Sequence, residues 1–343
     1  MKLDHGLLKK IQRQFNFESK SISEGIKNKT YPSSYNFPIG IQLELTEKCN
    51  LYCKHCYNAS GGAVKEECLN VDDWKRVTSR IIDAGGVFQC IISGGEPLLL
   101  GDDLIDIMSP LHDDGSGFIL ITNGYLVDSD WINRLKEFRY FWVQVSIDGV
   151  CEKVHDDFRG KRGSWEKAKN AALLFSGAGF PLRIAHTVTP YNLKDLTSFI
   201  RFAYHLGASS VVCGDVMLSG RANLNQDLLL SRKELSEMYD QIELLQDEYA
   251  GRMAILPSSP PSLDLVLKSS KPNGSVIIRP NGDVRLDCTL PFVIGNVLED
   301  DLLTIWNDKG ISCWENEDVV KYISDKQNGI LTHVNHCDND FRI

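Results

Sequence analysis

The sequence predicts an α/β protein in which a partial (β/α)6 barrel is followed by a small C-terminal α+β domain. From residue 41 onward, short apolar runs alternate with longer stretches of helical periodicity. Six such strand-then-helix units follow one another, which implies parallel strands joined by right-handed crossovers. A segment rich in proline and serine at 255–274 then ends the alternation and precedes a different pattern.

The number of units decides between architectures. Eight strand-then-helix units would close a full barrel, so six favour a partial one. A doubly wound open sheet is the competing arrangement, because it is built from the same units. Both place ligands at the carboxyl ends of the strands.

Each predicted strand is a short apolar run, and each predicted helix fills the interval that follows it. The strands are expected at 41–46, 88–93, 117–122, 141–147, 182–188 and 210–216. The helices are expected near 72–84, 102–113, 129–137, 164–178, 193–206 and 231–250.

The chain divides into three predicted parts. Residues 1–40 are polar and form an irregular extension or linker, with a short amphipathic piece at "LLKKIQRQF". Residues 41–250 form the core domain, and residues 255–343 form the small C-terminal domain. That last part contains an expected β-hairpin that turns at Asn281-Gly282, and a short helix near "DDLLTIWN".

Composition excludes several protein classes. A net charge of −9 argues against a nucleic-acid binder, whose footprint is basic. The N-terminal residues lack the apolar region of a secretory signal, and no apolar run is long enough to span a membrane. Ten cysteines without an export signal favour thiol chemistry or metal binding over disulfides, so we expect a cytoplasmic protein in a reducing compartment.

Three cysteines follow the first predicted strand at the spacing C-x3-C-x2-C. They are Cys49, Cys53 and Cys56, and their loop is expected at the carboxyl end of the sheet. A structural zinc site normally closes with four ligands, whereas a cubane iron–sulfur cluster held by three cysteines leaves one iron open to bind a small molecule. A zinc knuckle or a chance grouping of cysteines are the alternatives.

This cysteine motif, with His55 beside its last cysteine, resembles the radical S-adenosylmethionine (radical SAM) superfamily. The resemblance implies a [4Fe–4S] cluster whose open iron chelates SAM. It further implies that one electron cleaves SAM to a 5′-deoxyadenosyl radical, which abstracts a hydrogen atom from the substrate. In the family the aromatic residue at the position of His55 touches the adenine.

Further segments carry the same resemblance. "SGGEP" follows the second strand, and the family uses Gly94, Gly95 and Glu96 there to bind the SAM amino group. "TNG" ends the third strand and "SIDG" the fourth, which makes three more residues expected cofactor contacts: Asn123, Ser146 and Asp148.

Two later segments point to the SPASM/twitch branch of the superfamily. "HDDFRGKRGS" resembles a segment in which Arg159 would help to hold the SAM carboxylate by a bidentate pair. "MLSGRAN" resembles a segment that follows the sixth strand in that branch.

The C-terminal region resembles a SPASM or twitch tail, which carries auxiliary iron–sulfur clusters. Cys288 stands in a ligand position, and Cys313 and Cys337 follow. The pattern departs from that of the branch in two ways. The cysteine expected before the hairpin is absent, and the interval from Gly282 to Cys288 is one residue longer than usual. The three cysteines are therefore expected to hold one auxiliary cluster, with a tail that holds none as the alternative.

One further cysteine has a possible catalytic role. Cys213 lies on the sixth strand, two residues before Asp215, and a thiol facing the barrel interior could return a hydrogen atom to a substrate radical. A small buried residue is the plain interpretation. His186 and Glu44 are further candidates for the interior, since alternation fixes which residues share a face but not which face it is.

The resemblance leads to a peptide-modifying radical SAM enzyme that forms a crosslink or thioether or epimerises a residue. Its partners would be a precursor peptide and a reductant such as flavodoxin or ferredoxin. One alternative is the same chemistry on a small-molecule intermediate such as an aminoglycoside or nucleoside. Another is a non-catalytic iron–sulfur or zinc protein that acts as a sensor or scaffold.

Overall fold

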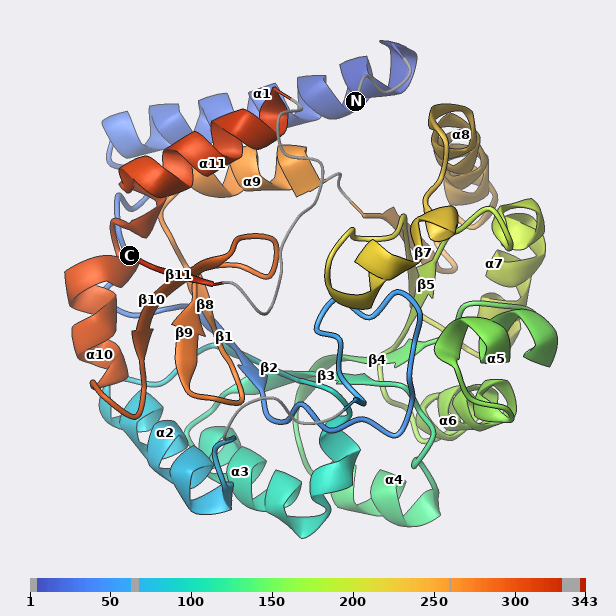
Figure 1. Ribbon diagram of the computed structural model, residues 1–343, viewed down its shortest axis with the longest axis horizontal. Helices are drawn as coiled ribbons and strands as arrows, with labels where there is room; N and C mark the ends of the chain where they lie inside the picture. Colours follow the sequence, from blue (N-terminus) through green and yellow to red (C-terminus); the bar gives the residue numbers. More distant parts are fainter. Residues whose placement is uncertain (1–4, 63–67, 259–260, 329–339) are drawn as a thin grey trace.

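The computed structural model describes residues 5–62, 68–258, 261–328 and 340–343, and these residues contain one eleven-stranded sheet. Its strand order is β11-β10-β9-β8-β1-β2-β3-β4-β5-β6-β7 (Figure 1). The central six are β1 (Gly40–Glu44), β2 (Gln89–Ser93), β3 (Gly117–Thr122), β4 (Tyr140–Ser146), β5 (Leu182–Thr187) and β6 (Ser210–Gly214).

These six strands lie in chain order, and each pairs in parallel with the next. A doubly wound sheet would reverse its order at a switch point, so this sequential order excludes that alternative. The predicted partial (β/α)6 barrel is confirmed. The carboxyl ends of all six strands therefore meet at one rim.

The helices lie around the outside of the strands (Figure 1). Six of them follow the predicted intervals within a few residues: α2 (Val71–Asp83), α3 (Asp102–Asp113), α4 (Ser129–Leu135), α6 (Ser164–Gly177), α7 (Leu196–His205) and α8 (Arg232–Glu248). An additional helix, α5 (Glu152–Arg159), was not predicted, and Gly160 ends it in the left-handed conformation at φ 70°.

Local side-chain contacts explain where two of these helices begin. Asn70 accepts a hydrogen bond from the Asp73 backbone N–H at 3.0 Å, while the Asp73 carboxylate accepts from the Asn70 N–H at 2.9 Å. Ser231 and Glu234 form the same reciprocal pair at the start of α8. Each such cap contributes about 1 kcal/mol, because it satisfies amide donors that have no partner inside the helix.

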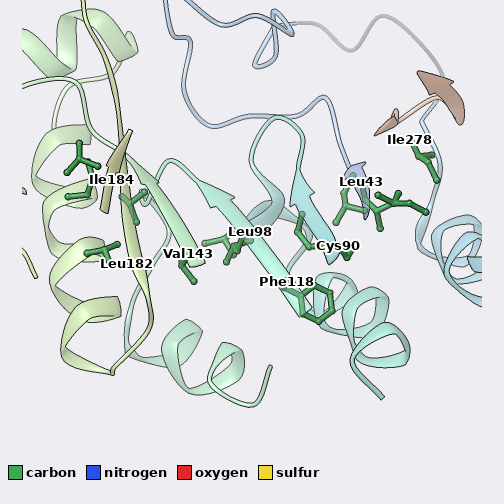
Figure 2. Packing of buried hydrophobic residues seen from close by; sticks show 14 of the residues in the cluster. Leu43, Cys90, Leu98, Phe118, Val143, Leu182, Ile184 and Ile278 are labelled. Carbon is green, nitrogen blue, oxygen red and sulfur yellow. The ribbon is translucent and has the colours of Figure 1, made fainter. Parts of the chain in front are cut away.

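The hydrophobic core lies between the sheet and these helices. Figure 2 shows Leu43, Cys90, Phe118 and Val143, which come from four neighbouring strands and belong to one buried cluster. On β1, Ile41 and Leu43 are buried in this cluster, and the alternate residue Gln42 faces the barrel interior. Each large apolar side chain that is buried here contributes about 1.5–3 kcal/mol.

The C-terminal region extends the barrel sheet. β7 (Ala254–Pro257) pairs with β6 at one edge, whereas β8 (Ser275–Ile278) pairs in parallel with β1 on the other side. β9 (Asp283–Arg285), β10 (Phe292–Asn296) and β11 (Phe341–Arg342) follow outward from β8. The sheet is therefore continuous across the boundary expected at 255–274, and the division into domains stays a prediction.

The predicted hairpin at Asn281-Gly282 is confirmed. β8 and β9 are antiparallel, and Gly282 adopts the φ of 87° that this turn requires. A side chain on Gly282 would also meet the Asn296 amide at 2.8 Å. The remaining helices of this region are α9 (Pro261–Ser269), α10 (Leu302–Ile305) and α11 (Glu317–Gln327).

The N-terminal segment is more regular than expected. Helix α1 (His5–Lys27) contains 23 residues and lies beside α9 (Figure 1). The following segment is also attached, because the Trp306 indole N–H donates to the Tyr35 carbonyl at 3.0 Å. The expectation of an irregular extension is thus wrong, since the helical periodicity continues beyond the short piece that was recognised. Among the described helices, none combines the length and apolar composition that a bilayer span requires.

Candidate functional site

A cavity of about 340 Å³ opens at the carboxyl ends of the barrel strands. Its described lining includes the three cysteines of the first loop and polar side chains from several strand ends. These residues are Gln42, Cys49, Leu51, Cys53, His55, Cys56, Tyr57, Ser60, Ser93, Gly94, Gly95, Ile121, Thr122, Asn123, Gln144, Ser146, Arg159, Ala185, Thr187, Asp215, Met217 and Arg221.

The loop of Cys49, Cys53 and Cys56 is held in place by the end of helix α5. The Tyr52 backbone N–H donates to the Arg159 carbonyl at 3.2 Å, and the Lys54 N–H donates to the Phe158 carbonyl at 3.0 Å. A side chain at Gly160 would overlap the Tyr52 carbonyl oxygen. Arg159 and Gly160, the last two residues of the "HDDFRG" segment, thus allow the end of α5 to pack against the cysteine loop.

A second segment holds the same loop from the other side. The Arg221 Nε donates to the Cys53 carbonyl at 2.8 Å, and its backbone N–H donates to the Cys56 carbonyl at 3.0 Å. The Asn225 amide donates to the Lys54 carbonyl at 3.1 Å. The segment "SGRANLN" (219–225) after β6 therefore satisfies backbone carbonyls that the turns of this loop leave without strand or helix partners.

The glycines after β2 allow two loops to approach closely. The Gly95 N–H donates to the Thr46 carbonyl at 2.6 Å, and the Glu96 N–H donates to the Lys48 carbonyl at 2.9 Å. A Cβ at Gly95 would overlap the Lys48 carbonyl oxygen. Gly94 and Gly95 both line the cavity, as expected for residues whose backbone would meet a ligand.

Glu96 directly follows the two glycines that line the cavity, and its side chain is fully buried. One carboxylate oxygen accepts from the Thr122 hydroxyl at 2.8 Å, and the other accepts from the Asn123 backbone N–H at 2.8 Å. Burial raises the pKa of Glu96 to about 7, although these hydrogen bonds oppose the shift. The side chain therefore ties the ends of β2 and β3 together and is not part of the described cavity lining.

Asn123 and Arg159 place N–H donors beside two of the sulfur atoms. The Asn123 amide donates to the Asn50 side chain at 2.8 Å and lies 3.7 Å from the Cys49 sulfur. The Arg159 Nη1 lies 3.8 Å from the Cys53 sulfur. Such donors stabilise a thiolate.

Asp148 forms a buried ion pair that fixes Arg159. Its carboxylate accepts from the Arg159 Nε at 2.6 Å and from the Thr187 backbone N–H at 2.8 Å. Burial is the largest single influence on Asp148 and raises its pKa, but the charge of Arg159 and the smaller effects of His55, His155 and His186 together outweigh it and lower the pKa to about 2. Asp148 is fully buried and does not belong to the described lining, whereas Ser146 does.

His55 presents a flat, neutral ring to the cavity. It stacks on Phe158 with the ring centroids 4.1 Å apart, and burial lowers its pKa to about 3. Its Nδ1 is buried and has no hydrogen-bond partner among the described residues. The ring could therefore contact another planar group and accept a hydrogen bond from it.

Cys213 and His186 face away from the cavity, which agrees with the plain interpretation of Cys213 as a small buried residue and not with the inward direction that was its alternative. The His186 ring stacks on the Phe199 ring of helix α7, with the ring centroids 3.7 Å apart. Cys213 of β6 lies opposite His186 of β5 in the parallel register. Paired residues of parallel strands point to the same face. The thiol of Cys213 is therefore buried in the core between sheet and helices, and its placement gives no support to a role as hydrogen-atom donor.

Glu44 does face the interior. It accepts a hydrogen bond from the Tyr57 hydroxyl at 2.6 Å and is nearly fully buried. This contact fixes the residue that directly follows Cys56.

Two of the C-terminal cysteines lie within the described residues. The Cys313 thiol donates to the Gly310 carbonyl at 3.0 Å and lies 3.4 Å from the Asn273 amide nitrogen. Cys288 is partly buried beside Asp287, and burial raises the pKa of its thiol. Cys337 lies outside the described residues. Among the described residues, no three cysteine, histidine or carboxylate side chains converge closely enough to hold a single metal ion.

Some lining residues were not predicted. Gln42, Gln144 and Arg221 contribute polar groups to the cavity, as does Asp215. A polar residue inside an otherwise apolar strand, such as the glutamine in "IQLEL" or in "WVQVS", is the signal that could have identified the first two.

Two family descriptions match this chain. Residues 43–203 match the radical SAM superfamily, and residues 270–329 match SPASM, an iron–sulfur cluster-binding domain.

Several curated proteins are similar in sequence. An AdoMet-dependent heme synthase from Methanosarcina barkeri is 33% identical over 56% of this chain and 55% of its own length. The antilisterial bacteriocin subtilosin biosynthesis protein AlbA from Bacillus subtilis is 26% identical over 80% of this chain and 61% of its own. A PqqA peptide cyclase from Bradyrhizobium diazoefficiens is 27% identical over 67% of this chain and 60% of its own. The chain thus spans 55–61% of the length of these relatives.

Solved structures share the fold. Streptococcus suis SuiB bound to S-adenosylmethionine superimposes with a TM-score of 0.65 at 16% identity, covering 85% of this chain and 70% of SuiB. Native anSMEcpe with bound AdoMet gives a TM-score of 0.63 at 18% identity, covering 84% of this chain and 83% of that chain. At these identities the likeness establishes the architecture alone.

Proposed function

We propose that this protein, whose residues 43–203 match the radical SAM superfamily and whose residues 270–329 match the SPASM domain, is an enzyme that generates a radical from S-adenosylmethionine and modifies a peptide. The observation that carries the proposal is the convergence of Cys49, Cys53 and Cys56 on one cavity at the strand ends. That cavity also contains glycine backbone, a neutral aromatic ring and a guanidinium group.

The donor set fits an iron–sulfur cluster. Burial raises the pKa of the Cys49 thiol to about 12, so its thiolate requires a strongly positive partner such as a metal. The N–H groups of Asn123 and Arg159 lie beside the sulfurs of Cys49 and Cys53, where they would stabilise metal-bound thiolates. We therefore assign Cys49, Cys53 and Cys56 as the ligands of a [4Fe–4S] cluster.

When bound, this cluster would supply the electron that cleaves SAM to methionine and a 5′-deoxyadenosyl radical, which then abstracts a hydrogen atom from the substrate. The protein's own residues would bind and orient SAM. The backbone at Gly94 and Gly95 and the hydroxyl of Ser146 offer hydrogen-bonding groups, and the ring of His55 offers a stacking surface for adenine. Arg159 would attract the SAM carboxylate from within its pair with Asp148.

The proposed substrate is a ribosomally made peptide, and the reaction is a crosslink, a thioether or an epimerisation. Among the similar proteins, AlbA is named for the biosynthesis of the bacteriocin subtilosin, PqqA peptide cyclase is named for a peptide, and SuiB has been solved bound to the precursor peptide SuiA. A small-molecule substrate is the second candidate, because the 33%-identical relative is a heme synthase. The reductant would be a flavodoxin or ferredoxin.

We further propose that Cys288, Cys313 and Cys337 contribute to one auxiliary cluster. The first two lie inside the segment that matches the SPASM domain. Three cysteines are too few for two clusters, which need about eight ligands.

The test is anaerobic reconstitution followed by reduction with dithionite. We expect 5′-deoxyadenosine to form from SAM in the wild-type protein and not in the Cys49→Ala, Cys53→Ala and Cys56→Ala triple variant. Iron and sulfide analysis should give about eight irons per chain with an auxiliary cluster and about four without it. A protein that contains only zinc, or that leaves SAM intact, would be the sensor or scaffold.

A further inference from the structure

A group of positively charged side chains lies beside the cysteine loop on the surface of the protein. Lys161, Arg162 and Lys167 come from the turn after α5 and the first turn of α6, two helices that pack together (Figure 1). The Lys161 and Lys167 ammonium groups lie 4.1 Å and 5.9 Å from the centre of the Tyr125 ring. Arg162, between them in the chain, is exposed, as is Lys167. These three residues form a cationic face.

The carboxylates around this cationic face are engaged elsewhere. Asp157 pairs with Lys54 at 2.7 Å, and Glu166 pairs with Lys169 at 2.6 Å. Asp156 accepts from backbone N–H groups at the start of α6. Within the part of the chain that the structure describes, no side chain of the cationic face forms an ion pair. Its charges are therefore available to a partner, in a chain whose net charge is −9.

The cationic face adjoins the backbone that carries two of the proposed cluster ligands. The Lys161 ammonium donates to the Asn50 carbonyl at 3.0 Å, and Asn50 directly follows Cys49. Tyr52 directly precedes Cys53, and its side chain is 55% exposed. A molecule that bound at this surface would thus be separated from the ligand cysteines by a single residue of the chain.

We propose that the cationic face, with the exposed ring of Tyr52, is the docking surface for an acidic electron-carrier protein such as flavodoxin. The inference rests on the proposed function, since a carrier has a reason to bind here only if the cysteines hold a redox cluster. One electron would leave the carrier, which is oxidised, and would enter the cluster, which is reduced, without the transfer of any atom.

Charge complementarity favours this partner. Cations without ion-pair partners attract an acidic surface and speed its approach, and electron-transfer complexes are typically small and transient. The aromatic ring of Tyr52 offers the apolar contact that such an interface needs at its centre. A nucleic acid, the other common polyanion, is disfavoured because the chain as a whole is acidic.

The experiment measures binding, with flavodoxin as the probe. Labelled, oxidised flavodoxin is titrated with the reconstituted protein at low ionic strength, and fluorescence anisotropy reports the complex. The variant is the double charge reversal Arg162→Glu with Lys167→Glu, at two exposed positions. We expect it to weaken binding about 10- to 100-fold and to remove most of the salt dependence, because ions screen attraction between surface charges. The rate at which reduced flavodoxin reduces the cluster should fall in the same variant.

Arg232→Glu with Lys233→Glu makes the same change of charge at the exposed start of α8 and is the matched control. It should retain the wild-type affinity, and iron content and urea unfolding establish that each protein is folded. Equal affinities in all three proteins would overturn the inference, as would a wild-type protein that does not bind flavodoxin. Equal losses in variant and control would also overturn it, since they would reflect net charge alone. Dithionite needs no docking surface, so a wild-type protein that leaves SAM intact with dithionite would instead refute the proposed function itself.

Discussion

Gly95 is the residue at which two loops of the site touch. Its neighbours are backbone atoms, so no flexible side chain can move to accommodate a Cβ. We predict that Gly95→Ala separates the loop after β2 from the cysteine loop and destabilises the protein by about 1–3 kcal/mol. Urea unfolding measures the loss, and iron retained after desalting measures the effect on the cysteine loop.

Gly177→Ala is the control for this change. Gly177 lies at the end of α6, and a Cβ there has no neighbour within 4 Å. Because alanine favours helix, the control should be neutral or stabilised by up to about 1 kcal/mol. If both alanine variants behave alike, close approach at Gly95 does not matter.

Glu96 gives a prediction about pH. Its pKa is raised from an ordinary 4.5 to about 7 by burial, so the folded protein binds the proton more tightly than the unfolded chain does. Its contribution to stability is therefore complete below about pH 4.5 and is lost as pH rises through 7, by roughly 3 kcal/mol.

The comparison is with Glu96→Gln, which has no titrating group at this position. Urea unfolding of both proteins from pH 4.5 to 8 should give stabilities whose difference changes across that range. Parallel curves would show that Glu96 does not titrate as its burial implies.

At the residue scale, sequence predicted residue types better than side-chain partners. The cysteines and the glycines of "SGGEP" were recognised because their spacing is local, and all five line the cavity. Asp148 and Glu96 have partners at the ends of other strands, and Asp148 has a further partner on helix α5, so these contacts depend on the register of the sheet and on helix packing. Local sequence carries no signal for that register, and for the same reason it left open which face of the sheet Cys213 occupies.

At the scale of elements, the segment 219–225 holds the cysteine loop in place through hydrogen bonds to its backbone carbonyls. Arg221 bonds the Cys53 carbonyl and lies over the Tyr52 ring at 3.9 Å. We predict that Arg221→Ala destabilises the loop by about 1–3 kcal/mol, because it leaves a buried carbonyl without its donor. A chelator should then remove iron from the reconstituted variant several-fold faster than from wild type.

Two further variants test whether the planar guanidinium group of Arg221 is needed to hold the cysteine loop. Arg221→Lys should be intermediate, since an ammonium retains the charge but not the planar donor set. Arg232→Ala, at an exposed position that begins α8, should release iron at the wild-type rate. Equal rates of iron removal in all four proteins would mean that Arg221 does not hold the cysteine loop.

Elements were predicted where their signals are periodic and long. The six central strands and six outer helices match to within a few residues. Helix α5 and strand β7 were missed because they are short and lie in segments whose composition favours turns or linkers. Their structure depends on contacts with the cysteine loop and with β6 respectively.

At the scale of the whole molecule, the C-terminal region completes one wall of the barrel. No local pattern predicts that β8 lies beside β1, because this pairing joins residues more than 230 positions apart, as in Ile278 with Leu43. The parallel pairing also sets Arg279 next to Glu44, at 3.9 Å. The first strand of the core is therefore joined to the tail by both backbone and charge.

Asp340 makes this junction testable. It accepts from Arg279 at 3.0 Å and from the fully buried Arg285 at 2.8 Å, and so ties the C-terminal residues to β8 and β9. Removing a buried partner leaves guanidinium charge uncompensated, so Asp340→Ala should lower the free energy of unfolding by about 3–5 kcal/mol. Asp308→Ala, at an exposed position in the same region, should lie within about 0.5 kcal/mol of wild type.

The same variant tests whether β1 and the tail unfold as one unit. If they do, the urea transition of Asp340→Ala will shift equally when it is followed by tryptophan fluorescence and by circular dichroism. A shift in only one signal, or none relative to Asp308→Ala, would show that the tail folds independently of the barrel.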